Sequence, residues 1–336
     1  MSLDPSTLLI IVVVSALLFD FVNGWNDSAN AIATVVSTRT LGPLQAVLMA
    51  AVLNFVGALV STKVAKTIGG DIVNPQIVTG DIVLAAMLAA TLWVAFCTIL
   101  GLPISGSHSL VGGLVGAAVA RFGTSCVHMA GIWKVMVGLF LSPVLGFIIG
   151  YILLVAVYWI AYKMKPRTVR KTFGVLQVLS SGFMAFTHGM NDAQKVMGVI
   201  TLALFSAGKI ADIIVPVWVM LTCAAVMALG TAAGGWGVIK TLGMKLAHIR
   251  PIEGFAAETA GGLVLSLAAH FGVPVSTTHT ITGSIMGVGT AFRAKAVKWS
   301  LGTKIVYAWV FTLPCTALFA AALTVVFAKL GIVATR

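Results

Sequence analysis

Apolar runs of about 20 residues recur from one end of this 336-residue chain to the other. A helix of about 20 residues rises roughly 30 Å, which matches the hydrocarbon core of a bilayer. Charged residues make up 9% of the chain, against about 25% in soluble domains, so a soluble fold would lack polar surface. We therefore expect an all-α polytopic membrane protein. The apolar runs lie near residues 8–37, 43–62, 82–101, 135–162, 173–205, 213–235, 254–272 and 304–330.

The first run is interpreted as a membrane span and not as a cleaved signal peptide. The residues before it include Asp4 and no Lys or Arg, and no small-residue cleavage site follows. The net charge of +12 comes from basic residues in short loops between the runs, which is typical of membrane topology and not of nucleic-acid binding. The cysteines show no metal-ligand spacing and are expected to be small buried residues: Cys97, Cys126, Cys223 and Cys315.

Two motifs occur twice in the same order. The segment FVNGWND at 21–27 returns 165 residues later as FTHGMND at 186–192. The segment PISGSHS at 103–109 returns 171 residues later as PVSTTHT at 274–280. Because both pairs keep their order at nearly equal offsets, the sequence predicts two structural repeats. Their expected boundaries are residues 1–165 and 166–336.

Each Pro-x-Ser motif precedes a short helical piece, near 108–120 and 280–292. About thirteen residues rise only about 20 Å, too little to cross the bilayer core. Since each piece follows a long apolar run, we expect a re-entrant helical hairpin in each repeat, with its tip inside the membrane. Glycines four residues apart in both pieces predict close helix packing. The first and fifth runs are expected to be broken at their Asn-Asp motifs.

The basic residues predict the orientation. If each hairpin returns to the side it came from, the loops near 38–42, 163–171, 236–250 and 292–304 share one side. Those loops hold thirteen of the 21 basic residues. The more basic side is expected to face the cytoplasm, which puts both termini outside. An odd number of crossings in the first repeat then makes the two repeats inverted, an architecture typical of secondary transporters.

The hairpin tips are the predicted oxyanion site. The first N–H groups of a helix are unpaired and carry partial positive charge, so two helix starts facing each other can bind an anion without Arg or Lys. Hydroxyl groups at the tips add donors, although ordinary N-capping is the alternative role for them. The predicted oxyanion-binding residues at the tips are Ser105, Gly106, Ser107, Ser276, Thr277 and Thr278.

Asp27 and Asp192 lie within apolar runs, where a carboxylate is costly unless it is paired or functional. Beside an anion they make sense as cation or proton acceptors, and we assign them both to the anion site and to coupling. Asn26 and Asn191 can offer carbonyl ligands to a small cation such as Na⁺. The other two acids within apolar runs are further candidates for coupling: Asp20 and Glu258.

Four other polar residues lie in or near these motifs. His108 and His279 are expected either to contact the anion or to support the hairpin tips. His188 precedes the second Asn-Asp motif, and a packing role is expected because Asn23 occupies the equivalent place in the first repeat. Lys195, equivalent to Asn30, is expected to pair with an acid.

The segments GWNDSAN at 24–30 and HGMNDAQ at 188–194, with the two Pro-x-Ser turns, resemble the PiT family of inorganic phosphate transporters. The resemblance covers nearly the whole chain. It implies symport of phosphate with H⁺ or Na⁺, in some bacterial members as a neutral metal-phosphate complex. It also implies two inverted repeats with two hairpins, usually in a homodimer. The site that it implies consists of Asn26, Asp27, Asn191, Asp192, Ser105, Ser107, Ser276 and Thr277.

The chain departs from the family's commonest pattern at two places. Gln194 and Lys195 stand where an Ala-Asn pair is frequent, which leaves the coupling cation open. A long central cytoplasmic insertion is replaced by the short basic stretch 163–171. Short members of this kind look bacterial, so we expect the cell inner membrane.

The same residues also bear on three alternative functions. A sulfate permease of the same superfamily is the nearest alternative, but HPO₄²⁻ can donate a proton to a carboxylate and sulfate cannot. An anion channel is disfavoured because buried acids would lie in its pore. An intramembrane enzyme would need a nucleophile with a paired base or a metal cluster, and the motifs offer neither. We expect no cofactor and no nucleic-acid partner.

Overall fold

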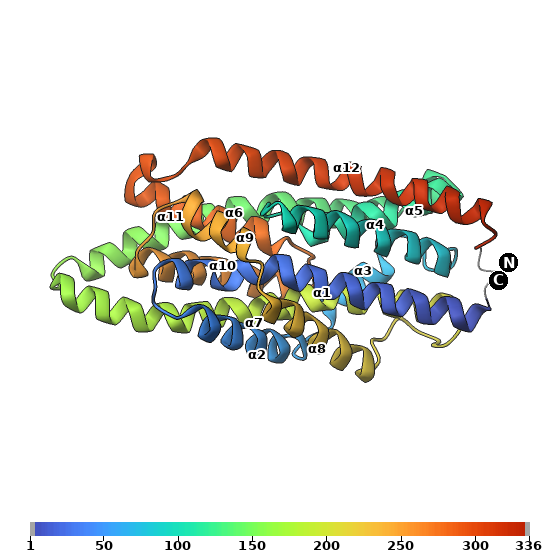
Figure 1. The fold of residues 1–336 in the computed structure, drawn as a ribbon, viewed down its shortest axis with the longest axis horizontal. Helices are drawn as coiled ribbons and strands as arrows, with labels where there is room; N and C mark the ends of the chain where they lie inside the picture. Colours follow the sequence, from blue (N-terminus) through green and yellow to red (C-terminus); the bar gives the residue numbers. More distant parts are fainter. Residues whose placement is uncertain (1–3, 333–336) are drawn as a thin grey trace.

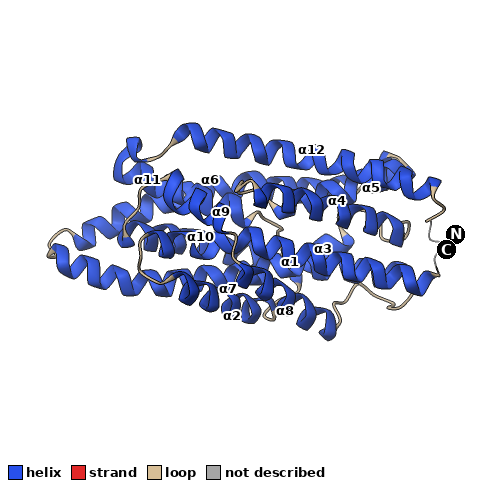
Figure 2. Cartoon of the chain, viewed as in Figure 1, coloured by secondary structure: helices blue, strands red, loops and turns tan. Residues whose placement is uncertain are grey.

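The computed structural model describes residues 4–332 as an elongated bundle of helices (Figure 1). Short loops join the helices (Figure 2), and the described residues contain no strand, only two isolated β-bridges. The start of α1 and the end of α12 lie at one end of the bundle, and the turn between α6 and α7 lies at the other (Figure 1).

The order of helices repeats once along the chain. The first half contains α1 (Pro5–Ser37), α2 (Pro43–Ala58), α3 (Lys63–Gly70), α4 (Gly80–Ile99), α5 (Gly106–Phe122) and α6 (Met129–Ala161). The second half contains α7 (Pro166–Ser206), α8 (Val217–Ala233), α9 (Trp236–Lys240), η2 (Thr241–Leu246), α10 (Pro251–His270), α11 (Thr277–Arg293) and α12 (Trp299–Lys329). A short 3₁₀ turn follows α5 as η1 (Thr124–Cys126) and α11 as η3 (Ala294–Ala296).

Five of the described helices are long and apolar enough to cross a membrane: α1, α4, α6, α10 and α12. Two bent pairs also qualify when each pair is taken as one span. The axis turns by 72° between α2 and α3, and by 61° between α8 and the helix over 236–246. The core therefore contains up to seven apolar crossings by this measure, with α7 added as a long, more polar helix at its centre.

The bends correct the predicted boundaries. The runs near 43–62 and 213–235 were expected to be single spans, and the loop expected near 236–250 is helical as far as Leu246. The helix α3 places Val64 and Ile68 in the core while Lys66 stays exposed. Apolar periodicity continues through each bend, so it gives no sign of the change in direction. The basic stretch 163–171 likewise contains the first turns of α7, which begins at Pro166.

The expected breaks in the first and fifth runs are wrong, because α1 and α7 are continuous helices. The glycines of the two motifs serve close packing instead. A Cβ at Gly24 would lie 2.7 Å from the carbonyl oxygen of Met227, and one at Gly189 would lie 2.1 Å from that of Asn54. The absence of a side chain lets a neighbouring backbone approach there, so glycine does not mark a break at these positions.

One Pro-x-Ser turn lies between α4 and α5, and the other lies between α10 and α11. In each case the chain segments that flank the helix pair lie side by side. The chain before α4 and the chain after α5 are joined by a β-bridge between Val73 and Val127. A second bridge, between Ala247 and Val297, joins the chain before α10 to the chain after α11. The tips contact each other, since Ser107 Oγ donates to the Val275 carbonyl at 3.1 Å. The helices α5 and α11 are longer than predicted but remain shorter than a span, at 17 residues each.

The predicted close packing of the glycine pairs is confirmed. Helix α5 lies on α12, and a Cβ at Gly116 would stand 2.1 Å from the Ala317 carbonyl oxygen. Helix α11 lies on α6 in the same way, with 2.1 Å between a Cβ at Gly287 and the Phe147 carbonyl oxygen. The long helices α12 and α6 thus pack at backbone distance against α5 and α11, respectively. This packing fixes the positions of the two Pro-x-Ser turns.

Candidate functional site

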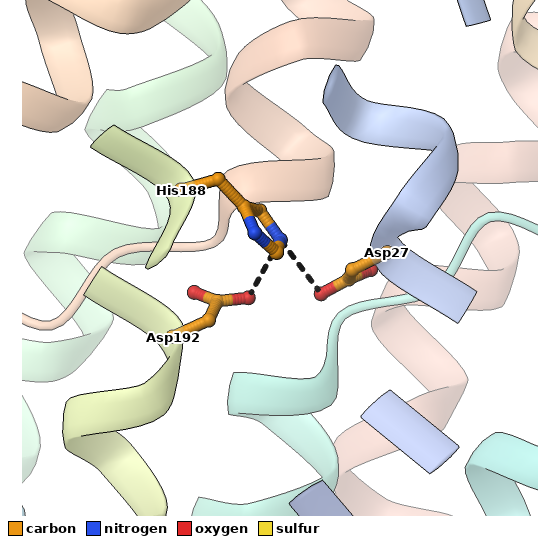
Figure 3. A group of neighbouring side chains, drawn as sticks. All are labelled: Asp27, His188 and Asp192. Atoms are coloured by element: carbon orange, nitrogen blue, oxygen red, sulfur yellow. Dashed lines mark ion pairs between the residues drawn. The ribbon is translucent and has the colours of Figure 1, made fainter. Parts of the chain in front are cut away.

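The two Asn-Asp motifs bring their carboxylates together at the centre of the bundle. Asp27 extends from α1 and Asp192 from α7, and the imidazole of His188 lies between them (Figure 3). His188 Nε2 is 3.4 Å from Asp192 Oδ2 and 3.9 Å from Asp27 Oδ2. All three side chains are at most 2% exposed, so the group is closed to solvent.

The expected packing role of His188 is therefore wrong. His188 and Asp192 are four residues apart on α7, which places them on one face of the helix, and this spacing was the available signal. On its other side the ring is fixed by Asn54, whose Oδ1 lies 3.0 Å from His188 Nδ1. The Asn54 amide is oriented in turn, because its Nδ2 donates to Thr231 Oγ1 at 2.8 Å. His188 Nδ1 is then the donor, and Nε2 faces the carboxylates.

The tip of α11 completes the group. Thr277 Oγ1 donates to Asp192 Oδ2 at 3.0 Å, and Thr278 Oγ1 donates to Asp27 Oδ1 at 2.8 Å. Asn30 Nδ2 donates to both threonine hydroxyls, at 3.2 and 3.0 Å. One hairpin tip thus bonds to both carboxylates, although the three segments are far apart in sequence.

The remaining tip residues stabilise the turns. Ser105 Oγ accepts from the backbone N–H of His108 at 3.1 Å, and Ser276 Oγ accepts from that of His279 at 3.2 Å. These two hydroxyls are N-caps, as the alternative interpretation held. Gly106 packs against Asn23, since a Cβ at Gly106 would lie 1.7 Å from Asn23 Oδ1.

The imidazoles of His108 and His279 contact each other with ring centroids 4.7 Å apart. His279 also stacks on Trp309 at 3.8 Å, and both histidines line an apolar groove between α6 and α12. Of the two roles expected for this pair, these contacts favour support of the tips.

The amide groups of Asn26 and Asn191 brace the hairpins. Asn26 Nδ2 donates to Thr98 Oγ1 at 2.7 Å, at the end of α4. Asn191 Nδ2 donates to the Leu265 carbonyl at 3.0 Å, in α10. The Oδ1 atoms of both asparagines are buried and have no hydrogen-bond partner among the described residues. Buried carbonyl oxygens are normally satisfied, so both atoms are suited to accept from water or to bind a cation.

The other two acids predicted for coupling, Asp20 and Glu258, are not joined to this group by hydrogen bonds. Asp20 is fully buried on α1, and both of its oxygens lack partners among residues 4–332. Glu258 on α10 accepts from Thr34 Oγ1 and Ser180 Oγ, so it links α10 to α1 and α7. Thr34 and Ser180 are polar contacts that the sequence motifs did not indicate.

Gln194 and Lys195, the two residues that depart from the family's commonest pattern, have different structural roles. Lys195 Nζ forms an ion pair and hydrogen bond with Asp192 Oδ1, which confirms the expected pairing with an acid. Gln194 Oε1 accepts from the backbone N–H groups of Val64 and Ala65, at 2.8 and 3.3 Å. Gln194 therefore caps the start of α3 and takes no direct part in the central group.

The arrangement has defined chemical requirements. Two carboxylates within a few ångströms of each other repel, so a proton or cation must accompany them. The ligand atoms of Asp27, His188 and Asp192 lie within 4.8 Å of one another, close enough to share one cation. Ionisable groups closed inside an apolar helical bundle are typical of membrane transporters. The fold and the site thus define a multi-pass membrane protein of the transporter class.

Comparison with known proteins gives the family. Residues 23–320 match the model of the phosphate transporter family, PHO4. The chain is 46% identical to a probable low-affinity inorganic phosphate transporter of Rhizobium meliloti, over 94% of this chain and 95% of that protein. It is 44% identical to the Bacillus subtilis protein of the same description, over 92% and 94%. The chain therefore belongs to the phosphate transporter family, as the motif resemblance implied.

A solved structure described as the sodium-dependent phosphate transporter has the same fold. Its TM-score is 0.87 at 25% sequence identity, and the alignment covers 96% of this chain and 99% of that one. The overall course of the helices is therefore shared with a phosphate transporter across almost the full length.

Proposed function

We propose that this protein imports inorganic phosphate by symport with a cation, H⁺ or Na⁺. The observation that carries the proposal is the joint bonding of Asp27 and Asp192 to the tip of α11 through Thr278 and Thr277. Anion-binding tips and cation-binding acids in direct contact give a physical route by which one ligand controls the site of the other. The descriptions of the relatives support phosphate as the cargo.

Phosphate would bind where the starts of α5 and α11 meet. The helix starts supply partial positive charge, and hydroxyl and backbone donors of Ser105, Gly106, Ser107, Ser276, Thr277 and Thr278 surround the tips. The contact between Ser107 and the Val275 carbonyl supports this placement, because it holds both helix starts at one point. A phosphate oxygen entering here would compete with the carboxylates for the threonine hydroxyls.

The coupling cation would bind at the carboxylates. Asp27 has no Lys or Arg partner among residues 4–332, and the Oδ1 atoms of Asn26 and Asn191, unpartnered within the same range, could supply neutral oxygen ligands. Asp20 lies seven residues before Asp27 on α1, and Thr34, the partner of Glu258, lies seven residues after it. Seven residues return a helix to almost the same face with a rise of about 10 Å. Asp20 and Glu258 would then be steps on the path of the coupling ion.

The membrane arrangement belongs to the same proposal. The repeated helix order supports two inverted repeats, 1–165 and 166–336. The two bridges at Val73 and Ala247 support re-entrant hairpins. The protein would lie as a homodimer in the cell inner membrane with both termini outside. The last four residues, on which part of that orientation depends, lie outside the described residues.

Uptake of radiolabelled phosphate into proteoliposomes tests the function. The wild-type protein faces a pH gradient, then a Na⁺ gradient, each with and without Mg²⁺ and with excess unlabelled sulfate. We expect uptake to follow one gradient, resist sulfate, and disappear in Asp27→Asn, which keeps the shape but loses the negative charge. The matched control Asp71→Asn alters an exposed acid outside the site and should transport normally.

Each contrary result has a defined meaning. Uptake abolished by sulfate would assign the chain to the sulfate permeases. Uptake indifferent to both gradients would rule out symport. Uptake that requires Mg²⁺ would identify a metal-phosphate complex as the cargo.

A further inference from the structure

Lys195 is a charged residue in an unusual place. Of the lysines and arginines among residues 4–332, it alone is buried, with 3% of its surface exposed. Its ammonium group forms a hydrogen-bonded ion pair with Asp192 Oδ1, one turn earlier on α7. A buried ammonium is costly to desolvate, so its presence at the centre of a transport site calls for a role there.

The internal repeat supplies the comparison. The offset of 165 residues that superposes Asp27 on Asp192 also superposes Asn30 on Lys195. Asn30 is neutral and donates to Thr277 and Thr278, and its Oδ1 has no partner among the described residues. The two repeats thus present equivalent carboxylates, but only the second has its own cation.

The chemistry of the two positions differs accordingly. Lys195 Nζ contacts Asp192 Oδ1, while Asp192 Oδ2 accepts from Thr277. A small metal cation bound at Oδ2 would lie close to the ammonium group, and the two positive charges would repel each other. Among the described residues, no lysine or arginine forms an ion pair with Asp27, and His188 Nε2 lies 3.9 Å from Asp27 Oδ2. An incoming cation therefore meets a fixed ammonium group at Asp192 and, among the described residues, no such ion pair at Asp27.

We propose that the Lys195 ammonium takes the place of one coupling cation, so that each phosphate is carried with one mobile cation fewer than two equivalent half-sites would bind. The remaining cation or proton binds on the Asp27 side. This inference rests on the proposed function, since a coupling ratio exists only in a symporter. It makes Lys195 a determinant of cation stoichiometry and not merely a structural ion-pair partner.

The variant Lys195→Asn restores the residue type of the first repeat and tests the inference. The number of cations moved with each phosphate is obtained from the membrane potential at which phosphate flux reverses. We expect this ratio to rise by one relative to the wild type, and uptake to acquire a steeper dependence on Na⁺. Lys63→Asn is the matched control, because Lys63 is exposed and its ammonium donates to the His270 carbonyl and not to a carboxylate.

A binding measurement separates this inference from the function itself. The melting temperature of each purified protein is followed in NaCl and in choline chloride. Na⁺ should stabilise Lys195→Asn more than the wild type, whether or not phosphate is transported. If the wild type moves no phosphate, the proposed function fails while this comparison still decides whether Lys195 excludes a cation.

The opposite exchange covers the case in which Lys195→Asn does not fold. Asn30→Lys places a second ammonium beside Asp27 and should remove the stabilising effect of Na⁺ and lower the cation ratio by one. If either folded variant has the wild-type ratio and the wild-type response to Na⁺, Lys195 is only a structural partner of Asp192 and the inference is wrong.

Discussion

The orientation of the His188 imidazole depends on two polar side chains from two other helices. Asn54 of α2 holds His188 Nδ1 at 3.0 Å and is itself fixed by Thr231 of α8. Without this acceptor the ring would be free to turn Nε2 away from Asp27 and Asp192. The geometry of the central group is therefore set by residues outside both repeated motifs.

The substitution Asn54→Leu tests this dependence. It keeps the branched shape of the side chain, although leucine is larger, and removes the oxygen that accepts from His188. Because losing a buried hydrogen-bond partner costs about 1–3 kcal/mol, we expect phosphate affinity to fall by roughly tenfold. The half-saturating phosphate concentration for uptake measures the change. Thr201→Val serves as the control, since that buried hydroxyl bonds only to the Met197 carbonyl of its own helix. An unchanged affinity in Asn54→Leu would show that the ring needs no such support.

At the scale of single residues, the sequence indicated which acids are important but not which side chains contact them. Asp27 and Asp192 were predictable because a carboxylate in an apolar run is costly and these two recur in equivalent motifs. The contacts of Asn54 and Gln194 were not predictable, because each depends on a partner more than a hundred residues away. For His188, the spacing of four residues from Asp192 was a local signal. Side-chain direction within a helix bundle is decided by packing, which a single sequence does not display.

Among the elements, the Pro-x-Ser turns and the short helices after them were predictable and the bends were not. A Pro-x-Ser turn followed by a helix too short to cross the bilayer has a local signature in sequence. The 72° bend between α2 and α3 has none, because the apolar residues continue on both sides of it. The continuity of α1 through its motif was also hidden, since a glycine for close packing looks the same as a glycine for a break.

Helix α11 gives a test of what positions a hairpin. A Cβ at Gly287 would stand 2.1 Å from the Phe147 carbonyl oxygen of α6, so backbone would have to move to admit any side chain. We expect Gly287→Val to destabilise the protein by about 1–3 kcal/mol or more, the usual cost of overpacking. The melting temperature in detergent measures this loss. Gly174→Ala is the control, because nothing lies within 4 Å of its added Cβ and alanine favours a helix. Equal melting temperatures for the two variants would contradict the packing role of Gly287.

For the whole molecule, the internal repeat made the order of the helices predictable from the sequence. Two motifs at nearly equal offsets predict two similar halves, and the observed helix order repeats accordingly. What the repeat does not give is the asymmetry between the halves. The tip of α11 carries Thr277 where the tip of α5 carries Gly106, and α7 carries Lys195 where α1 carries Asn30. The two halves thus contribute different residues to one site, so the repeat accounts for the order of the helices and not for the chemistry of the site.

The direction in which the bundle lies in the membrane follows from charge. The turn between α6 and α7, with Lys163 and Lys165, lies at the end of the bundle opposite the start of α1 (Figure 1). Retention of Lys and Arg on the cytoplasmic side predicts that this turn is inside, and that the loop containing Lys209 is outside. Single-cysteine substitutions Lys165→Cys and Lys209→Cys, both at exposed positions, test this with a membrane-impermeant maleimide. In intact cells only Lys209→Cys should react, and both should react after permeabilisation. The unsubstituted protein corrects for its own four cysteines, three of which are buried. Labelling of Lys165→Cys alone in intact cells would reverse the orientation, and phosphate import would then have to begin from the more basic face.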